Sequence, residues 1–389
     1  MKTLIELYDE RPIKNVLATD MFHPEETIIL CPPNVTDIRK VRTTIEKYLD
    51  YRRCNTRITV IQVSLLDARK TEKRLRNILE SHPDCAINIS GGSDTTLYAV
   101  GRSCGETPVF TFSRKNNTFY DVSNAAFARN LPCTSIHDAQ ACFLLAGGKM
   151  LPGRADNSDL KDRLSQIDSL FSVFRKNRRI WRSQITYIQK ISSSLPGELS
   201  AKGKPAVQAD HGMVAADNSF LTALQDADLI RDLKISDEEI RFTFPDETIR
   251  FWLRDIGSVL ELQVWRACLE AGCFDDVVLS AVVNWEGADT QRNTVTNEID
   301  VVAVRGVWPT FISCKTSEIH TEALNELAVL NYKFGRNGNK AVIVTSAPST
   351  KGRSVMRQRA AEMNIEVIEW DDLELDRLTQ RIRSITEQK

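Results

Sequence analysis

Several features that would place a protein in a familiar class are missing from this sequence. No apolar run approaches the roughly 20 residues that a membrane-spanning helix needs, and residues 1–9 carry acidic side chains where a signal peptide would be apolar. The nine cysteines include no CxxC pair and have no histidines at zinc-finger spacing. We therefore expect a cytoplasmic protein with reduced thiols, no zinc finger and no membrane partner.

An excess of either charge is also missing. The 51 basic and 52 acidic side chains leave a net charge of -1, so any contact with nucleic acid has to be local. The pattern GxGxxG, which marks dinucleotide-binding sites, does not occur. The composition that is present, 42% hydrophobic and 26% charged residues in a chain of 389, is typical of a globular protein with two or three domains.

Residues 1–148 alternate apolar strands with amphipathic helices. Strands are predicted over residues 27–31, 57–63, 85–89 and 107–112, and helices over residues 35–52, 68–81 and from about residue 95. This alternation is typical of a parallel sheet with helices on both faces, so we predict a Rossmann-like α/β domain.

The rest of the chain predicts two further units. Residues 149–250 predict a helical linker and a small winged-helix-like module, with helices over 159–193 and 220–233, a linker over 194–217 and a hairpin over 240–252. Residues 251–389 predict an α/β domain with a mixed sheet. Its helices are expected over 259–271, 318–334 and 351–363, and its strands over 277–283, 298–304, 310–313, 340–345 and 365–369.

Charged groups interrupt the buried strands of this last unit. Asp300 lies within an apolar strand, and Lys315 follows the next apolar run. A buried unpaired charge is unfavourable, so each side chain is expected to have a partner. Together with Glu261 from the preceding helix they would form a cluster of the kind that binds Mg²⁺ or Mn²⁺. The simpler alternative is an Asp–Lys pair that only holds two strands together.

The sequences Asn-Glu-Ile-Asp at residues 297–300 and Ser-Cys-Lys at residues 313–315 resemble the motifs of the PD-(D/E)xK nuclease superfamily. The resemblance implies a restriction-endonuclease-like domain in which Asp300 and Glu261 hold a metal ion that activates a water molecule. It also implies that Lys315 orients this water and stabilises the charge of the transition state.

One position departs from the superfamily pattern. The residue two places before the lysine is usually a carboxylate, and in this chain it is Ser313. A hydroxyl is a weaker metal ligand than a carboxylate. Either Glu261 or Glu298 compensates for the difference, or the site is weakened.

A turn of small residues follows the strand predicted over 85–89. It runs from Ser90 through two glycines to Thr95 and opens a helix. Small residues let a ligand approach the backbone, and the N–H groups at the start of a helix favour phosphate. The loop after the first predicted strand, with Pro33 and Asn34, would lie at the same edge of the sheet. A plain tight turn between strand and helix is the alternative.

This turn, followed in the same chain by nuclease-like motifs, resembles the CRISPR-associated Rossmann-fold (CARF) nucleases, in particular the type III ancillary effectors with a C-terminal PD-(D/E)xK domain. The resemblance implies a homodimer that binds cyclic tetra-adenylate as an allosteric activator and cleaves DNA or RNA in antiviral defence. The residues that it implies for the activator are Pro33, Asn34, Ser90, Gly91, Gly92, Ser93, Asp94 and Thr95.

Two other functions remain open. The chain could be a ligand-sensing transcription regulator with an inactive nuclease-like domain, or a ring nuclease that degrades its own cyclic ligand. A basic run could contact the phosphates of a nucleic acid, although such a run is more often a solvated helix face or a partner for acids of the same chain. Its members are Arg175, Lys176, Arg178, Arg179 and Arg182.

Overall fold

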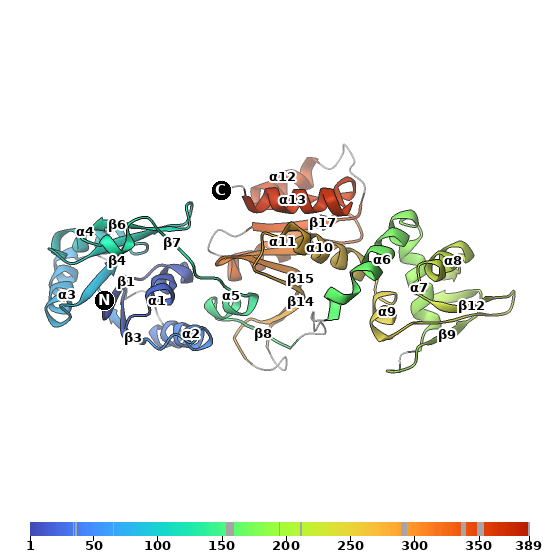
Figure 1. Ribbon diagram of the computed structural model, residues 1–389, viewed down its shortest axis with the longest axis horizontal. Coiled ribbons are helices and arrows are strands. Elements are labelled where there is room, and N and C mark those ends of the chain that lie inside the picture. The colour runs from blue at the N-terminus through green and yellow to red at the C-terminus, as the bar shows by residue number, and fades with distance from the viewer. Residues whose placement is uncertain are drawn as a thin grey trace.

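The computed structural model describes residues 1–33, 35, 37–64, 66–152, 159–193, 195–210, 212–288, 294–335, 340–347 and 354–387. Three units follow one another along the long axis of the molecule (Figure 1). Their order in space differs from their order in sequence, because the C-terminal unit lies between the N-terminal unit and the middle module. In the described ranges, no helix is both long and apolar enough to cross a membrane.

A seven-stranded sheet forms the N-terminal unit. Its strands stand in the order β3-β2-β1-β4-β5-β6-β7, in which the first five pair in parallel and the last two are antiparallel. The strands are β1 Thr3–Leu7, β2 Glu26–Cys31, β3 Arg57–Gln62, β4 Cys85–Asn88, β5 Val109–Ser113, β6 Thr118–Ser123 and β7 Leu131–Pro132. The helices are α1 Leu17–Phe22, α2 Ile38–Tyr51, α3 Ala68–Ser81 and α4 Asp94–Ser103. Apolar cores on both faces of the sheet confirm the predicted Rossmann-like domain.

Strand β1 lies at the centre of this sheet and is absent from the predicted strands. All five of its residues are buried, although Glu6 makes the run look too polar for a central strand. It pairs with β2 on one side and with β4 on the other. The switch point, where successive connections leave in opposite directions, therefore lies between the carboxyl ends of β1 and β4.

The middle module packs helices against a three-stranded antiparallel sheet of order β12-β13-β9, beside the hairpin β10–β11. Its helices are α6 Leu164–Lys176, α7 Trp181–Ile191, α8 Asn218–Asp226 and α9 Glu247–Trp252. Its strands are β9 Ser200–Gly203, β10 Ala206–Ala209, β11 Gly212–Ala215, β12 Arg231–Ile235 and β13 Ile240–Thr243.

Three predictions for this module are wrong in detail. Short strands occupy the expected linker over 194–217, and the helix expected over 220–233 ends at Asp226. Residues 247–252 form a helix instead of a second hairpin strand, because the Asp246 carboxylate accepts a hydrogen bond from the Ile249 backbone N at 2.9 Å and caps that helix. The hairpin partner of β13 is β12 instead.

The C-terminal unit is built on a six-stranded mixed sheet of order β18-β17-β16-β15-β14-β8. Its strands are β8 Lys149–Met150, β14 Asp276–Asn284, β15 Thr296–Arg305, β16 Trp308–Lys315, β17 Lys340–Thr345 and β18 Ile365–Ile368. Its helices are α5 Ala139–Leu145, α10 Ser258–Ala271, α11 Thr321–Phe334, α12 Ser354–Glu362 and α13 Leu375–Glu387. The predicted order of helix, three strands, helix and strand is confirmed; α13 and the short strand β8 were not expected from the sequence.

Continuous apolar cores join the three units. One core contains residues of the middle module, of α10 and α13, and of one face of the C-terminal sheet. A second joins the N-terminal unit to the turn between β15 and β16, whose Val307 is 2% exposed. Helix α5 lies between the N-terminal and C-terminal sheets (Figure 1) and contributes to the cores on both sides.

Candidate active site and ligand pocket

Asp300 lies where the strands on both of its sides are distorted. On the β14 side, Ser280 stands opposite it with a left-handed φ of 52°. On the β16 side, the regular pairing with β15 stops at Val301. The Asp300 carboxylate replaces the missing ladder bonds, because its Oδ2 accepts hydrogen bonds from the Cys314 backbone N at 2.6 Å and from Ser313 Oγ at 3.3 Å. The distortion thus places a carboxylate beside the C-terminal end of β16.

Glu261 approaches Asp300 from the first turn of α10. This helix begins at Ser258, where the Asp255 carboxylate accepts a hydrogen bond from the Ser258 backbone N at 2.7 Å. Burial, and then the negative charges of Asp300, Asp255 and Glu298, raise the pKa of Glu261 to about 8. We call Asp255, Glu261, Glu298 and Asp300 the acidic cluster. Its members repel one another, so a cation among them would be favourable.

Lys315 faces this cluster from the end of β16. Burial raises the pKa of Asp300, while the Cys314 N–H and the Lys315 charge act in the opposite direction. Among the described residues, however, Asp300 and Lys315 form no ion pair. The two side chains therefore interact through their charges without a direct ion pair. Cys314 is buried in the core against α10, and Glu298 is exposed.

The acidic cluster offers hard oxygen donors, but few of them converge. Glu261 and Asp300 are two partly buried carboxylates, the charge of Asp300 raises the pKa of Glu261, and Ser313 supplies a hydroxyl beside Asp300. Within the described residues, no group of three or more His, Cys, Asp or Glu side chains is arranged to hold a metal ion. Mg²⁺ is often held by one or two carboxylates and completes its shell with water and substrate oxygens, so two such donors fit this ion.

The turn after β4 packs closely against the end of β1. A Cβ atom on Gly91 would lie 2.5 Å from the Leu7 carbonyl oxygen, and Gly92 has a φ of 98°. Both glycines are therefore required by the close approach of the two strand ends. Ser90 precedes them, and Thr95 follows in the first turn of α4.

The other residues predicted to bind the activator lie around this turn in different ways. Ser93 Oγ accepts a hydrogen bond from the Thr96 backbone N at 3.3 Å and so caps α4, whereas the Asp94 side chain is exposed. Pro33 is exposed in the loop after β2, and β1 separates that loop from the turn. Asn34 lies outside the described residues.

A buried polar chain fixes Ser90. The Asn88 side chain donates a hydrogen bond to Glu6 Oε2 at 2.8 Å, and Ser90 Oγ donates to Asn88 Oδ1. The same hydroxyl accepts a hydrogen bond from the Phe112 backbone N at 2.7 Å. Burial raises the pKa of Glu6 well above its ordinary value, which favours the neutral acid in the centre of the sheet.

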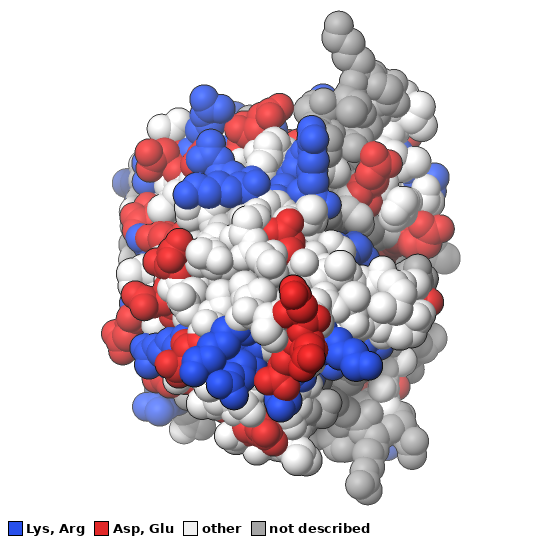
Figure 2. All heavy atoms as spheres, turned by 90° about the vertical axis from the view of Figure 1, so that its right-hand side faces the viewer, with Lys and Arg blue, Asp and Glu red and all other residues white. Residues whose placement is uncertain are grey.

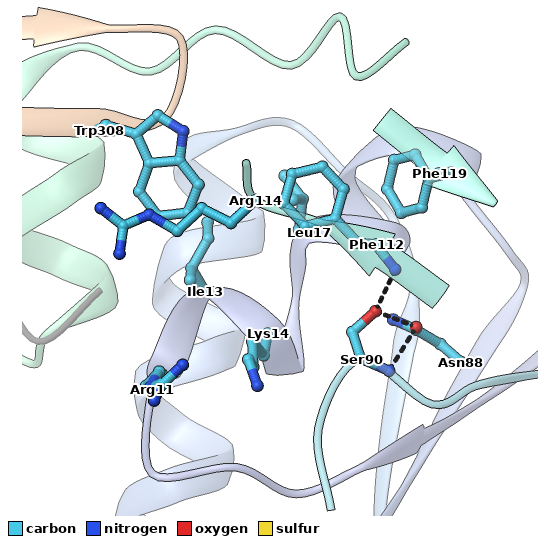
Figure 3. Close-up of a pocket in the computed structure, with 10 residues that line it drawn as sticks. All are labelled: Arg11, Ile13, Lys14, Leu17, Asn88, Ser90, Phe112, Arg114, Phe119 and Trp308. Atoms are coloured by element: carbon cyan, nitrogen blue, oxygen red, sulfur yellow. Dashed lines mark hydrogen bonds between the residues drawn. The ribbon is translucent and has the colours of Figure 1, made fainter. Parts of the chain in front are cut away.

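A pocket opens beside Ser90 at the carboxyl ends of β1, β4 and β5 (Figure 3). Three of its lining side chains are cationic and three are aromatic, a combination that suits the phosphate and the base of a nucleotide. We call it the switch-point pocket. It is lined by Arg11, Ile13, Lys14, Leu17, Asn88, Ser90, Phe112, Arg114, Phe119 and Trp308.

Sequence reasoning missed most of this pocket. Arg11 and Lys14 follow β1, and a loop after an unrecognised strand cannot be placed at a sheet edge. The available signal was the apolar run before Tyr8, followed by a polar turn with Pro12. Trp308 comes from the C-terminal unit, and no local pattern could have brought it to the N-terminal sheet.

Part of the basic run holds the middle module against the candidate active site. The Arg178 guanidinium lies 4.4 Å from the centre of the Trp370 ring and donates a hydrogen bond to the Ser346 carbonyl oxygen at 3.1 Å. The Ser346 backbone N in turn donates to the Lys315 carbonyl oxygen at 3.0 Å. The turn between α6 and α7 therefore lies at the same end of the sheet as Lys315.

The rest of the run divides into paired and unpaired side chains. Arg175 forms an ion pair with Glu374. Lys176, Arg179 and Arg182 are exposed, and within the described part of the chain they have no ion pair. These three cations are available to the phosphates of a nucleic acid.

The described residues on the outer face of the middle module form no continuous basic surface. Figure 2 shows a broad band of uncharged atoms on this face, between separate groups of basic and acidic side chains. Duplex binding by such a module depends on a row of cations along the phosphate backbone. On the described part of this face, the cations form separate groups instead of such a row.

No protein-family model and no curated protein sequence matches the chain. Among solved structures, protein VC1899 from Vibrio cholerae aligns with a TM-score of 0.74 at 14% identity, covering 98% of both chains. Can2 from Sulfobacillus thermosulfidooxidans, in complex with cyclic tetra-adenylate, aligns with a TM-score of 0.69 at 16% identity, again covering 98% of both chains. The chain therefore shares the fold of these two proteins over nearly its whole length, as expected for a Rossmann-like N-terminal unit joined to a nuclease-like α/β domain.

Proposed function

We propose that this protein is a metal-dependent nuclease activated by cyclic tetra-adenylate, an ancillary effector of type III CRISPR defence. The observation that carries the proposal is the convergence of Glu261, Asp300 and Lys315 where the ladder between β15 and β16 stops. A fold alone does not select a function. The site supplies the chemistry, and the fold shared with a protein that binds cyclic tetra-adenylate supplies the class of activator.

The proposed metal ligands are Glu261 and Asp300. A bound Mg²⁺ or Mn²⁺ ion lowers the pKa of a coordinated water molecule and polarises a phosphate. The Cys314 N–H fixes the orientation of the Asp300 carboxylate, and the Lys315 ammonium stabilises negative charge that develops on the phosphate. Ser313 stands where a third carboxylate is usual, so we expect weak metal binding with Glu298 as the available additional donor.

The proposed activator site is the carboxyl edge of the N-terminal sheet. The turn from Ser90 to Thr95 supplies small side chains and backbone N–H groups, and the switch-point pocket adds Arg11 and Lys14. Pro33 and Asn34, from the loop after β2, complete the proposed set. A ring of four identical nucleotides has two-fold symmetry, which suits two copies of one site in a homodimer.

The proposed substrate is DNA or RNA. Lys176, Arg179 and Arg182 are exposed cations on the turn and helix that lie beside Lys315, and they would contact the phosphates that flank the cleaved bond. Three such contacts give a salt dependence that neutral substrates would not show.

One observation favours a second function. Ser313 and the lack of a third converging carboxylate in the described residues would suit a sensor that binds cyclic tetra-adenylate but no longer cleaves. In that case the protein would bind its ligand tightly and show no metal-dependent activity.

The deciding experiment measures cleavage of supercoiled plasmid, single-stranded DNA and single-stranded RNA with Mn²⁺ or Mg²⁺, with and without cyclic tetra-adenylate. Asp300→Asn and Lys315→Met test the site, and Glu270→Gln, an exposed position on α10, is the matched control. Linear tetra-adenylate and cyclic hexa-adenylate control for the ring. Cleavage that requires ring, metal and both site residues supports the nuclease. Tight ring binding without cleavage of any substrate supports the sensor.

A further inference from the structure

The switch-point pocket and the candidate active site lie at opposite ends of one strand. Trp308, which lines the pocket, is the first residue of β16, and Lys315 is the last. At about 3.3 Å per residue, the strand spans roughly 23 Å between them. Strand β15 runs alongside, pairing Arg305 with Trp308 at the pocket end and carrying Asp300 near its middle, next to the last residue paired with β16. A displacement of Trp308 therefore acts directly on the strand that presents Lys315.

In the described structure, Trp308 is held by an arginine of the N-terminal unit. The Arg114 guanidinium lies over its indole ring, 4.6 Å from the ring centre, as Figure 3 shows. We call this contact the Arg114–Trp308 stack. Burial, with a further contribution from the positive charge of Arg11, lowers the pKa of Arg114. The pocket lining places Arg11 and Lys14 around the same space as Arg114, a set of cationic side chains that suits a phosphate.

The rest of the β15–β16 turn is fixed to the N-terminal unit by different contacts. Val307 is buried in the N-terminal core, and the Gly306 carbonyl oxygen accepts a hydrogen bond from the His137 backbone N at 2.7 Å. The turn is therefore a firm pivot, and the Arg114–Trp308 stack is the one of these contacts that faces the pocket and can respond to a ligand.

We propose that a phosphate of the activator enters the switch-point pocket and binds Arg11 and Arg114. This binding draws the Arg114 guanidinium off the Trp308 ring. The proposal rests on the function proposed above, in which cyclic tetra-adenylate is the activator. Guanidinium–phosphate pairs form two charge-assisted hydrogen bonds, which are stronger than a stack on an aromatic face. Occupancy of the pocket thus releases the Trp308 end of β16, and the Lys315 end changes its position relative to the acidic cluster.

The Arg114–Trp308 stack forms only in the resting state, so it opposes both activator binding and activation of the nuclease. By linkage, a substitution that removes the stack has to favour activator binding and activation by the same factor. A merely structural role for Trp308 would not have this effect. A variant without the stack will bind the activator more tightly and cleave faster without it, whereas a damaged fold weakens both.

The experiment compares Trp308→Ala and Arg114→Ala in the full-length protein. For Trp308→Ala we expect an activator-free cleavage rate about fivefold higher and a Kd for cyclic tetra-adenylate about fivefold lower, as for a half-exposed cation–π contact. For Arg114→Ala we expect the same rise in activator-free cleavage but a Kd at least tenfold higher, because the phosphate loses its partner. Arg102→Ala is the matched control, since it removes an arginine from the Tyr98 ring elsewhere in the same unit.

A fluorescence titration keeps the test open if Trp308→Ala does not fold. The emission of Trp308, taken as the wild type minus Trp308→Phe, changes on saturation with cyclic tetra-adenylate if Arg114 leaves the ring. An unchanged emission, or an unchanged activator-free rate and Kd in a folded Trp308→Ala, overturns this inference while the nuclease function stands. A wild type that neither binds nor responds to the activator overturns the proposed function, and this inference with it.

Discussion

Replacing Glu261 by glutamine is expected to stabilise the metal-free protein at alkaline pH, although Glu261 is a proposed metal ligand. Burial and the neighbouring carboxylates raise its pKa from an ordinary value of 4.5 to about 8. The unfolded chain releases this proton near pH 4.5, whereas the folded protein keeps it until about pH 8. The stability that the protonated group supports is therefore complete below pH 4.5 and is lost as the pH rises.

The magnitude follows from the width of that window. Each pH unit between the two values lowers the free energy of unfolding by about 1.4 kcal/mol, so the wild type at pH 8 is weaker by about 5 kcal/mol. Glutamine has no such proton to lose, and Glu261→Gln is expected to avoid the whole decrease. If the chain unfolds as one unit, this difference corresponds to roughly 6 °C in Tm.

The assay is scanning calorimetry with EDTA at pH 5, 7 and 9. Wild type and Glu261→Gln should melt together at pH 5 and separate progressively above it. Glu270→Gln, exposed on the same helix, should follow the wild type at every pH. Added Mn²⁺ should raise the Tm of the wild type at pH 9 and have less effect on Glu261→Gln. Parallel curves for wild type and Glu261→Gln across this range would refute the assignment of a raised pKa to Glu261.

Three further predictions concern single positions. Gly91→Ala should lower the free energy of unfolding by about 2 kcal/mol or more, because its Cβ would meet the Leu7 carbonyl oxygen at 2.5 Å. Gly101→Ala, with open space around it on α4, should raise the free energy of unfolding by about 1 kcal/mol. Urea denaturation measures both, and equal effects would contradict the close approach at Gly91. Ser313→Glu should raise Mn²⁺ affinity and the cleavage rate by about tenfold or more by adding a carboxylate, while Ser313→Ala should not, as calorimetric titration and a plasmid assay would show. Glu6→Gln should leave the Tm unchanged at pH 5 and raise it at pH 9, because the raised pKa makes the wild-type acid increasingly unfavourable as it ionises; a fall in Tm at pH 9 would show that Glu6 is stabilised as an anion.

The elements that sequence patterns predicted best are those whose stability is local. Helix α3 matches its prediction from Ala68 to Ser81, because Asp67 caps its first turn and Leu75 and Ile78 recur at helical spacing on its buried face. Strand β17 likewise matches as a short β-branched run buried over nearly its whole length.

Sequence patterns did not predict strand β1, because the tertiary structure favours the neutral form of its one acidic residue, Glu6. Glu6 reads as a charge in the sequence, but burial favours its neutral form and Asn88 from β4 satisfies one of its oxygens. With β1 unrecognised, its following loop could not be placed, and Arg11 and Lys14 were missed as well. Both the missed strand and the missed pocket residues follow from the contact between Glu6 and Asn88, which are more than 80 positions apart in the sequence.

The candidate active site shows the same division. The pattern of charged residues in apolar strands was sufficient to select Glu261, Asp300 and Lys315, and the structure places them within electrostatic reach of one another. The left-handed φ of Ser280 and the end of the β15–β16 ladder, which leave the Asp300 carboxylate to bond the Cys314 backbone N, have no local signature. Neither does the stack of Arg114 on Trp308, since its two residues belong to different units.

The path of the chain through the C-terminal sheet limits how this protein can be divided. Strand β8 is inserted at one edge before the chain leaves for the middle module, and one face of the sheet shares its core with that module. A fragment that begins at α10 would lack the middle module, and one face of the C-terminal sheet would lose part of the apolar core that it shares with this module. In evolutionary terms, the portion that recombination could transfer as a working piece would have to include the middle module and the C-terminal unit together, so the two are expected to have been inherited as one block.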